Sequence, residues 1–534
     1  MADKTNRILP VGIQSFEKLR KEGFLYVDKT DIIWQLANCG KTYNYLSRPR
    51  RFGKSLLVDT LQAYFEGKQE LFEGLKIMQL EKNWTPRPVI RLDMSRGGSE
   101  AASLSSYLRL AFGRYEEQYG ISTTSGTSLA DRFDQIIQTA CNQTGQQVAI
   151  LIDEYDSPLQ HSWKTPEHEA CTDIYKAVFA ILKADDEYEK FVFITGITKF
   201  TQISLFSVLN NLGNISFDAP YASICGITKE EVTDNFIPEI EAMGEANGWT
   251  VDETVQQLKA YYDGYHFSAD NMVDVFNPFS LLNALADKKL RNYWAASGAT
   301  SMLPKFVEDM EIRLEEFENC YIDSDTLETS DVTGGGSELF LYQSGYLTIK
   351  DYDEGMYTLG IPNNEVRRAL NKVVLPALTL KTISQVISTQ NLLQKMMQIG
   401  NLSEAKKALK SLVADVPYSN KKLGSMDMEE RYRLILSTIF NAIGFKVEVE
   451  RMMGTGRIDM VVYTRRYIYV LELKLTNNGG LDAAEAQIKD RGYTAPFHAD
   501  GRKVIALAVE LDDMGKGLID WKEVGLTTTS QIQT

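Results

Sequence analysis

Two hydrophobic stretches near the C-terminus carry three charged residues whose types suit phosphodiester chemistry. Residues 454–475, GTGRIDMVVYTRRYIYVLELKL, predict the strands IDMVVY and YIYVLELKL joined by a tight polar turn. Asp459 lies on the first strand, and Glu472 and Lys474 lie two apart on the second, where side chains point to the same face. A β-hairpin would bring the three together. Two carboxylates can hold Mg²⁺, and a lysine can orient water or offset phosphoryl charge.

The Glu-x-Lys pattern by itself is typical of a solvated strand face. Here, however, YIYVLELKL is apolar on both sides of Glu472, which predicts a buried strand. An unpaired carboxylate is costly in such a strand. Asp459 likewise precedes the apolar residues MVV. The surroundings therefore favour a site over a solvated face.

A second candidate site lies in the N-terminal part, in the segment RPRRFGKS (48–55). It falls between a predicted strand, YNYL (43–46), and a predicted helix, SLLVDTLQAYF. Its last three residues match GxxxxGK[ST], with Arg48 in the place of the first glycine. Gly53 would let the backbone approach phosphate, Lys54 would reach the β and γ phosphates, and Ser55 would hold magnesium. Arg50 and Arg51 would add positive charge beside the same pocket. The competing interpretation is a basic surface turn.

A carboxylate pair supports the phosphate interpretation. VAILIDEYD is an apolar strand that ends in Asp153 and Glu154, about 100 residues after the loop. Asp153 could join the magnesium shell, and Glu154 could activate the attacking water. A third strand, FVFIT (191–195), leads to Gly196, Thr198 and Lys199. Thr198 is either a γ-phosphate sensor or an ordinary strand-end threonine.

The elements that must position these residues suggest three regions. Buried strands separated by helices predict a parallel α/β sheet in residues 1–225. Residues 226–420 predict a helical lid and connector with sparse short strands, interrupted by a turn-rich loop at 330–338. The polar stretch 415–428 predicts a boundary, after which the helix ERYRLILSTIFNAIGF opens a last domain at 421–534 that also contains the strand KVIALAVEL.

Composition restricts the class of protein further. The 534 residues carry a net charge of −15, which argues against non-specific coating of nucleic acid. Residues 421–534 hold 16 basic and 16 acidic residues, so the excess of acid lies wholly in residues 1–420. A nucleic-acid contact in the C-terminal part is therefore less opposed by the negative charge of the protein.

Cysteine and histidine usage disfavours several chemistries. The five cysteines include no CxxC pair, and the four histidines include no HExxH spacing. The sequence therefore disfavours a disulfide framework, a zinc site and a histidine-based catalytic triad. The N-terminal segment lacks the apolar core of a secretory signal, and no apolar run is long enough to span a membrane. We expect a cytoplasmic protein that uses carboxylates and lysines.

At the level of family, much of the chain resembles the bacterial AAA-ATPase-like proteins, whose phosphate loop typically reads RPRRFGKS. Matching stretches are LPVGIQSFEKLRKEGFLYVDKT (9–30), VAILIDEYDSPL (148–159), FITGITKFTQISLFSVLNNL (193–212), YYDGYHF (261–267), NYWAASG (292–298) and LGIPNNEVR (359–367). The resemblance implies a P-loop NTPase domain that binds ATP and Mg²⁺, with Arg48 as the usual residue at its position. A winged-helix-like connector and a nuclease-like domain would follow.

The C-terminal part is similar to the PD-(D/E)XK nuclease superfamily, with D(x12)ELK intact. This resemblance implies that Glu429 or Glu430, on the opening helix, joins the metal site. It also implies that Gln487 is the polar residue near the substrate strand, although a surface glutamine is an equal alternative.

Both resemblances together predict an ATP-binding or ATP-hydrolysing protein coupled to a Mg²⁺-dependent nuclease that acts on nucleic acid, with DNA expected over RNA. Two rivals stay open. One is a nucleotide-controlled switch or scaffold that assembles oligomers and uses the nuclease fold only for docking. The other is a nuclease whose ATPase part is structural.

Overall fold

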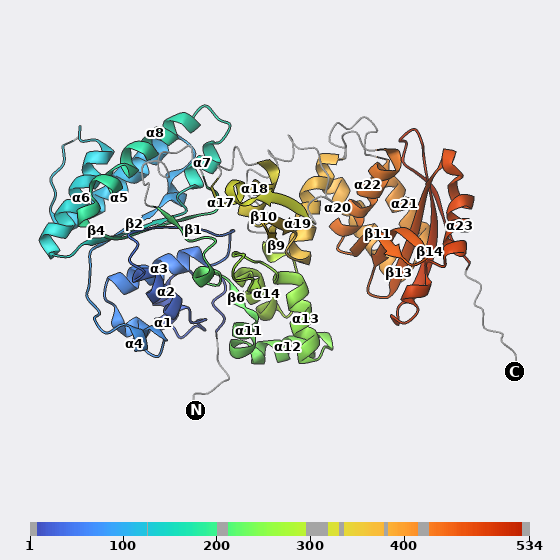
Figure 1. Cartoon of the computed structure of the whole chain (residues 1–534), viewed down its shortest axis with the longest axis horizontal. Helices are drawn as coiled ribbons and strands as arrows, with labels where there is room; N and C mark the ends of the chain where they lie inside the picture. Colours follow the sequence, from blue (N-terminus) through green and yellow to red (C-terminus); the bar gives the residue numbers. More distant parts are fainter. Residues whose placement is uncertain are drawn as a thin grey trace. The chain divides into compact units, whose positions relative to one another are not determined.

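The computed structural model describes residues 8–124, 126–199, 212–294, 319–329, 336–378, 383–414 and 427–525. Two compact units divide the chain, one made of Met1–Met302 and Asn319–Glu365 and the other of Leu303–Glu318 and Val366–Thr534 (Figure 1). Several features named above lie outside the described residues, wholly or in part: the N-terminal residues 1–7, the stretches 200–211 and 295–298, most of the loop 330–338, and the segment 415–426. Domain limits at 225/226 and 420/421 stay predictions.

A five-stranded parallel sheet organises the first unit. Its strand order is β2-β3-β4-β1-β5. The strands are β1 (Tyr43–Ser47), β2 (Val89–Asp93), β3 (Val148–Asp153), β4 (Glu189–Gly196) and β5 (Gly213–Asn214). All six residues of β3 are buried, as expected for a parallel strand covered on both faces. The predicted α/β class is confirmed.

Helices cover both faces of this sheet, as Figure 1 shows. On one side lie α1 (Phe16–Lys21), α2 (Thr30–Ala37) and α3 (Lys54–Phe65). On the other side α5 (Ala101–Tyr119), α6 (Leu129–Thr144) and α8 (His168–Phe179) pack against one another. Shorter helices are α4 (Ile77–Leu80), α7 (Ser157–Ser162) and α9 (Ile181–Ala184).

Residues 227–287 form a helical subdomain with its own core. Its elements are β6 (Ile227–Thr228), α11 (Lys229–Asn235), α12 (Ile237–Asn247), α13 (Val251–Tyr262), β7 (Val275–Phe276) and α14 (Pro278–Asp287). The sequence suggests one helix through EEVTDNFIPEIEAM, but the structure has two, divided at Phe236. Pro238 lies in the first turn of α12, where its missing N–H is tolerated, whereas it would break a helix interior.

A small antiparallel sheet follows in the connector. Its order is β8-β10-β9, from β8 (Cys320–Asp323), β9 (Thr348–Asp353) and β10 (Met356–Gly360). The helices α17 (Ser324–Thr329) and α18 (Gly336–Gln343) precede β9. The connector thus combines helices with a few short strands, and its winged-helix character stays a prediction.

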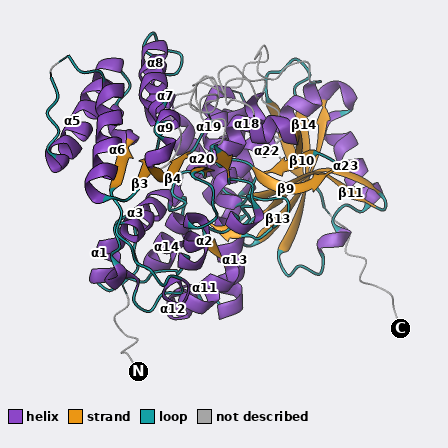
Figure 2. Ribbon diagram, turned by 60° about the vertical axis from the view of Figure 1, so that its left-hand side comes forward, coloured by secondary structure: helices purple, strands orange, loops and turns teal. Residues whose placement is uncertain are grey.

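The second unit contains a five-stranded mixed sheet in the order β11-β12-β13-β14-β15, with only β13 and β14 parallel (Figure 2). The strands are β11 (Lys446–Met453), β12 (Gly456–Tyr463), β13 (Tyr467–Leu475), β14 (Lys503–Leu511) and β15 (Leu518–Glu523). The helices are α19 (Asn364–Leu378), α20 (Ile383–Ile399), α21 (Leu402–Val413), α22 (Met428–Ala442) and α23 (Gly480–Arg491).

The predicted hairpin of β12 and β13 is confirmed by its antiparallel register, in which Met460 pairs with Leu471. A further strand, β11, forms a second hairpin with β12 that the sequence analysis did not predict. Helix α23 connects β13 to β14 and packs on both strands. Among the described residues, no helix is long and apolar enough to cross a membrane.

Candidate functional sites

The loop between β1 and α3 turns sharply where the sequence predicts phosphate binding. Gly53 adopts φ 92°, and the non-glycine Arg51 adopts φ 68°. These left-handed conformations let the chain enter α3 at Lys54 immediately after the loop. The N–H groups at the start of α3 therefore lie beside the loop, which suits an anion.

Lys54 lies inside this loop. Its Nζ donates to the backbone oxygens of Arg48, at 2.9 Å, and Pro49, at 3.0 Å, and the residue is 6% exposed. Burial lowers the pKa of this ammonium, against the charges of Glu154 and Asp153. The loop thus fixes a buried cation at one place, next to two carboxylates.

Those two carboxylates are delivered by the end of β3. Burial raises the pKa of Asp153, while a hydrogen bond with the Ser55 hydroxyl opposes the rise. Burial raises the pKa of Glu154 too, against the charge of Lys54. Glu154 has φ 48°, a conformation that is rare outside glycine and often found at functional sites. The structure therefore brings Ser55 to Asp153 and Lys54 near both acids.

A cavity of about 420 Å³ opens on this group. Its wall combines charged and apolar side chains from the phosphate loop, the N-terminal segment and α14. The lining includes Arg50, Arg51, Lys54, Ser55, Glu154 and Phe279. The Arg51 guanidinium lies 4.8 Å from the centre of the Phe279 ring, which holds its charge at the rim.

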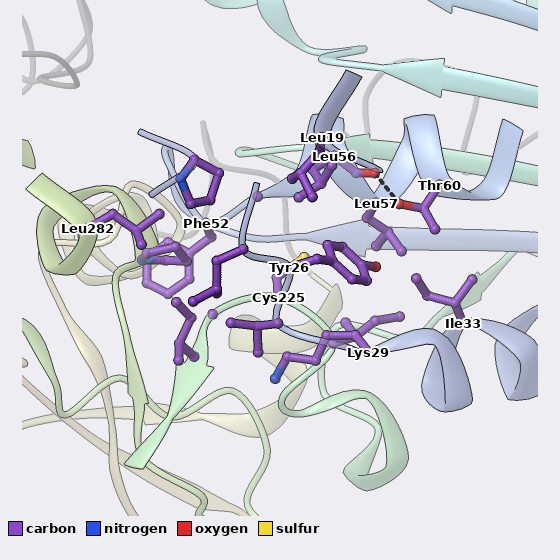
Figure 3. Close-up of a pocket in the computed structure, with 18 of the residues that line it drawn as sticks. Leu19, Tyr26, Lys29, Ile33, Phe52, Leu56, Leu57, Thr60, Cys225 and Leu282 are labelled. Atoms are coloured by element: carbon purple, nitrogen blue, oxygen red, sulfur yellow. Dashed lines mark hydrogen bonds between the residues drawn. The ribbon is translucent and has the colours of Figure 1, made fainter. Parts of the chain in front are cut away.

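A second, mainly apolar cavity of about 110 Å³ adjoins the first (Figure 3). The two share Pro10, Gly53, Leu56, Pro278 and Leu282. Tyr26, Ile33 and Leu57 are among the other residues around it. One end of the combined space is therefore cationic and the other apolar, which matches the two ends of a nucleotide.

Arg48 contributes to the loop differently from its neighbours. It is fully buried, and its guanidinium donates to the carbonyl oxygens of Ser47, Ser216 and Tyr221 at 2.8, 2.8 and 3.0 Å. It also lies 4.1 Å from the centre of the Phe267 ring, and burial lowers its pKa to about 10. Arg48 therefore ties the start of the loop to two distant segments and does not line the 420 Å³ cavity.

Thr198 is also buried among protein partners. Its hydroxyl donates to Asp156 Oδ2 at 2.7 Å and accepts from Gln160 Nε2 at 3.0 Å. Its backbone N–H donates to the same Asp156 oxygen at 2.6 Å. A γ-phosphate-sensing role stays a prediction, and it would require Thr198 to exchange these partners.

The second candidate site lies on the hairpin of β12 and β13. From the pair Met460–Leu471, one step along each strand leads to Asp459 and Glu472. Asp459 Oδ2 accepts from the backbone N–H of Leu473 at 2.8 Å, and Lys474 Nζ donates to Glu472 Oε1 at 2.8 Å. The three residues predicted to act together are therefore close in space.

This group is strongly buried for a cluster of charges. Glu472 is 0% and Asp459 is 5% exposed. Burial, followed by the charge of Asp459, raises the pKa of Glu472 to about 7. Burial lowers the pKa of Lys474, but the hydrogen bond and charge of Glu472 raise it overall. Two like charges and one cation thus share a poorly solvated space.

The opening helix α22 places one of its two candidate glutamates toward this space. Burial and the charge of Asp459 raise the pKa of Glu429, while Lys474 and Arg433 oppose the rise. Arg433 lies 3.6 Å from Glu429. Glu430 is exposed on the surface. The structure therefore brings Glu429, rather than Glu430, into electrostatic contact with the cluster.

Gln487 lies on α23 and makes a different contact. Its Nε2 donates to the Tyr493 hydroxyl at 3.0 Å, and that hydroxyl donates to the Arg457 carbonyl oxygen at 2.8 Å. Gln487 thus supports β12 through Tyr493. Its role next to a substrate stays a prediction.

The carboxylates of the hairpin fit a divalent cation. Glu472 Oε2 is buried and has no hydrogen-bond partner, which is costly unless another group meets it. Among the described residues, no group of three or more His, Cys, Asp or Glu side chains could hold a metal by itself. Mg²⁺ usually takes only one or two carboxylates and completes its shell with water and substrate phosphates. Asp459 and Glu472 provide two carboxylates, whereas Ser55 and Asp153 provide a hydroxyl and one carboxylate in the first unit.

One functional candidate was missed by the sequence analysis. Glu450, on β11, has φ 50°, and its Oε1 accepts from Arg433 at 2.7 Å and from Arg457 at 2.9 Å. It links the helix that carries Glu429 to the strand that carries Asp459. Period-two alternation in KVEVE is the signal that could have revealed β11, but the left-handed backbone at Glu450 has no counterpart in the residue pattern.

Comparisons with known proteins match a family in each of the two parts of the chain. Residues 10–206 match a family described as predicted AAA-ATPase, and residues 427–521 match the PD-(D/E)XK nuclease superfamily. A relative from Azotobacter chroococcum mcd 1, described as an uncharacterized protein in the vnfD 5′ region, is 30% identical over 522 residues. The match covers 96% of this chain and 98% of that protein.

Similar solved structures include the Aeropyrum pernix ORC2 protein, with a TM-score of 0.25, 11% identity, and coverage of 70% of this chain and 97% of that one. Cdc6p from Pyrobaculum aerophilum has a TM-score of 0.24, 12% identity, and coverage of 70% and 96%. These scores are too low to support an argument about function. From the family matches and the nearly full-length relative, the chain belongs to the AAA-ATPase-like family, with a PD-(D/E)XK nuclease-superfamily domain at its C-terminus.

Proposed function

We propose that this protein binds and hydrolyses ATP in its N-terminal unit and cleaves nucleic acid, with DNA as the expected substrate, in its C-terminal domain. Mg²⁺ serves both sites. Cleavage is coupled to the nucleotide state of the phosphate loop. Domain limits near residues 225 and 420, and assembly into a homo-oligomer, belong to the same proposal.

In the N-terminal site, each group has one role. Lys54, fixed by two loop carbonyls, neutralises the β and γ phosphates. Ser55 and Asp153, which share a hydrogen bond, hold the cation. Glu154 orients and deprotonates the attacking water. The phosphates occupy the 420 Å³ cavity, and the base takes the apolar cavity beside it.

In the C-terminal site, Asp459 and Glu472 hold the cation. Glu429 is near enough to Asp459 for the two carboxylates to interact electrostatically. A bound Mg²⁺ supplies Lewis-acid polarisation of the scissile phosphate. Lys474 offsets the negative charge that develops on the phosphoryl oxygens, and its hydrogen bond to Glu472 keeps it in position.

The buried, unpartnered Oε2 of Glu472 carries the nuclease part of this proposal. This oxygen belongs to a residue that is 0% exposed and lies beside a second carboxylate, and it has no hydrogen-bond partner among the described residues. A divalent cation is the partner that the donor atoms suit, because hard oxygen ligands are those that Mg²⁺ prefers.

Separate substitution of the two sites tests the proposal. ATP hydrolysis and cleavage of linear, circular and single-stranded DNA would be measured for the parent, Lys54→Ala and Glu472→Gln, with and without ATP and Mg²⁺. We expect Lys54→Ala to lose hydrolysis and ATP-dependent cleavage, and Glu472→Gln to lose cleavage alone. If the parent cleaves no DNA or RNA with Mg²⁺ or Mn²⁺, the domain is a docking module of a nucleotide-controlled scaffold.

A further inference from the structure

The end of β11, next to the turn into β12, displays an apolar side chain to solvent. Met452 is 76% exposed, the highest value among the large hydrophobic residues that the structure describes. Single exposed hydrophobic residues are common and by themselves need no explanation. Met452 differs because its surroundings are rigid and charged, and because it lies close to the candidate metal site.

The turn is held firmly by the end of α23. Thr455 Oγ1 donates to the Arg491 carbonyl oxygen at 2.7 Å, and Arg491 Nη1 donates back to the Thr455 carbonyl oxygen at 2.8 Å. Tyr493 donates to the Arg457 carbonyl oxygen. Met453, next to Met452, packs against the hydrophobic core of the sheet. A projecting side chain on such a support loses little further backbone entropy on binding.

The register of the strands relates this turn to the candidate metal site. Met452 pairs with Arg457, so the two residues lie directly opposite each other. Arg457 and Asp459 are two apart on β12, hence on the same face and about 7 Å from each other along the strand. An apolar group, a cation and a metal-binding carboxylate thus follow one another on a short path.

We propose that Met452 and Arg457 form a nucleic-acid contact next to the scissile phosphodiester. Met452 inserts against or between bases, and Arg457 binds a backbone phosphate one or two nucleotides from the cleaved bond. Methionine is among the apolar side chains that proteins insert between base steps, where it partly unstacks them. This inference rests on the proposed nuclease function and adds how the substrate is held.

The charge of Arg457 and the position of this surface next to the candidate metal site favour nucleic acid as the partner that binds Met452 and Arg457. The Arg457 side chain is 50% exposed, so one side of its guanidinium can reach a phosphate while Nη1 stays with Glu450. A polyanion that reaches Asp459 along β12 must pass Arg457. A neutral or acidic protein partner could bind here without extending to the metal site.

The test measures base unstacking in the full-length protein. A duplex with 2-aminopurine at the cleavage position would be titrated with a Glu472→Gln form, which binds without cutting. We expect 2-aminopurine emission to rise on binding, because unstacking relieves its quenching. In the same background, Met452→Ala should abolish most of the rise and weaken binding about three- to tenfold. Met514→Ala is the matched control, since Met514 is 68% exposed in the same unit.

Arg457 is tested through salt dependence. Arg457→Gln should weaken binding on all sequences and lower the slope of log affinity against log salt by about 1, as expected for one lost phosphate contact. Circular dichroism should show an intact fold for both hairpin variants. Unchanged emission and affinity in Met452→Ala would overturn the inference, even if cleavage by the parent is normal. A change in self-association alone would assign the turn to a protein contact instead.

The outcomes are separable from those of the proposed function. Loss of cleavage by Glu472→Gln tests the metal site and does not depend on Met452. Cleavage by the parent with no effect of Met452→Ala or Arg457→Gln would leave the nuclease proposal intact and remove only this contact.

Discussion

Lys474 Nζ lies 2.8 Å from Glu472 Oε1, while Oε2 of the same carboxylate is buried without a hydrogen-bond partner among the described residues. One oxygen is thus held by the lysine. The other oxygen is left as a ligand atom for a cation. The same lysine remains close to where phosphoryl charge would develop.

Glu472→Gln should lower cleavage by more than about 100-fold, because the amide cannot supply an anionic ligand. Initial rates of plasmid nicking at saturating Mg²⁺ measure the effect. Glu523→Gln, an exposed change on β15, is the control and should cleave like the parent. Equal rates for Glu472→Gln and the parent would show that the cation is held elsewhere.

Lys54→Ala should lose ATP binding by at least about tenfold, since it removes the buried cation that the loop carbonyls fix. A fluorescent-ATP titration measures this. Lys190→Ala, an exposed change, should bind as the parent does. Unchanged affinity in Lys54→Ala would refute the phosphate-loop assignment.

Glu154→Gln should bind ATP and hold it, with turnover reduced by roughly 100-fold, because an amide orients water but cannot accept its proton. Retention of labelled nucleotide through gel filtration, with release assayed over time, measures the trap. Turnover equal to that of the parent would place the base at another residue.

The buried Glu189, at the start of β4, should make stability depend on pH. It is 2% exposed, and burial raises its pKa from the ordinary 4.5 to about 8. The folded chain therefore keeps a proton that the unfolded chain releases between these values. The contribution of Glu189 to the free energy of unfolding is therefore greatest below about pH 4.5, and it falls as the pH rises toward 8.

Glu189→Gln should remove this dependence and be more stable than the parent at pH 8.5, with a smaller difference at pH 5. Urea unfolding at both values, followed by circular dichroism, measures the change. Glu117→Gln, an exposed change on α5, serves as the control. Parallel pH profiles for the parent and Glu189→Gln would contradict the expectation.

The extent of the C-terminal domain can be tested with two fragments. Tyr469, on β13, donates to the Met397 carbonyl oxygen at 2.6 Å, and Lys406 lies 2.6 Å from Asp520. Helices α20 and α21 therefore contact the sheet. A fragment of residues 421–534 should unfold at least about 5 °C below one of residues 366–534, because it loses this packing.

Thermal unfolding of both fragments measures the difference. Equal midpoints would show that residues 421–534 suffice, which is the limit predicted from the sequence. Limited proteolysis that never cuts within residues 415–428 would count against a boundary there.

Much of this protein could be predicted from local pattern. The strands β1, β3, β4, β12, β13 and β14 occur where the sequence predicts strands, although β4 and β12 are longer than predicted. The candidate roles of Lys54, Asp153, Asp459, Glu472 and Lys474 were predicted from residue type and from position on strands or loop turns. Such features are encoded within about ten residues, where the spacing of side chains is set by the backbone itself.

Other features depend on contacts between distant segments. The sequence could not choose between Glu429 and Glu430, because the choice depends on which face of α22 meets the sheet. The sequence showed only that Arg48 stands in the place of the first glycine, whereas the structure buries it against the carbonyl groups of residues 216 and 221. The role of Glu450 could not be predicted from the sequence, since it depends on two arginines from separate elements.

The sequence by itself thus determined which chemical groups are available and on which elements they lie. Tertiary structure decided which of them are buried, which share a cavity and which become structural. The physical reason is that burial and Coulomb energy depend on distance in space, and residues far apart in the chain set both.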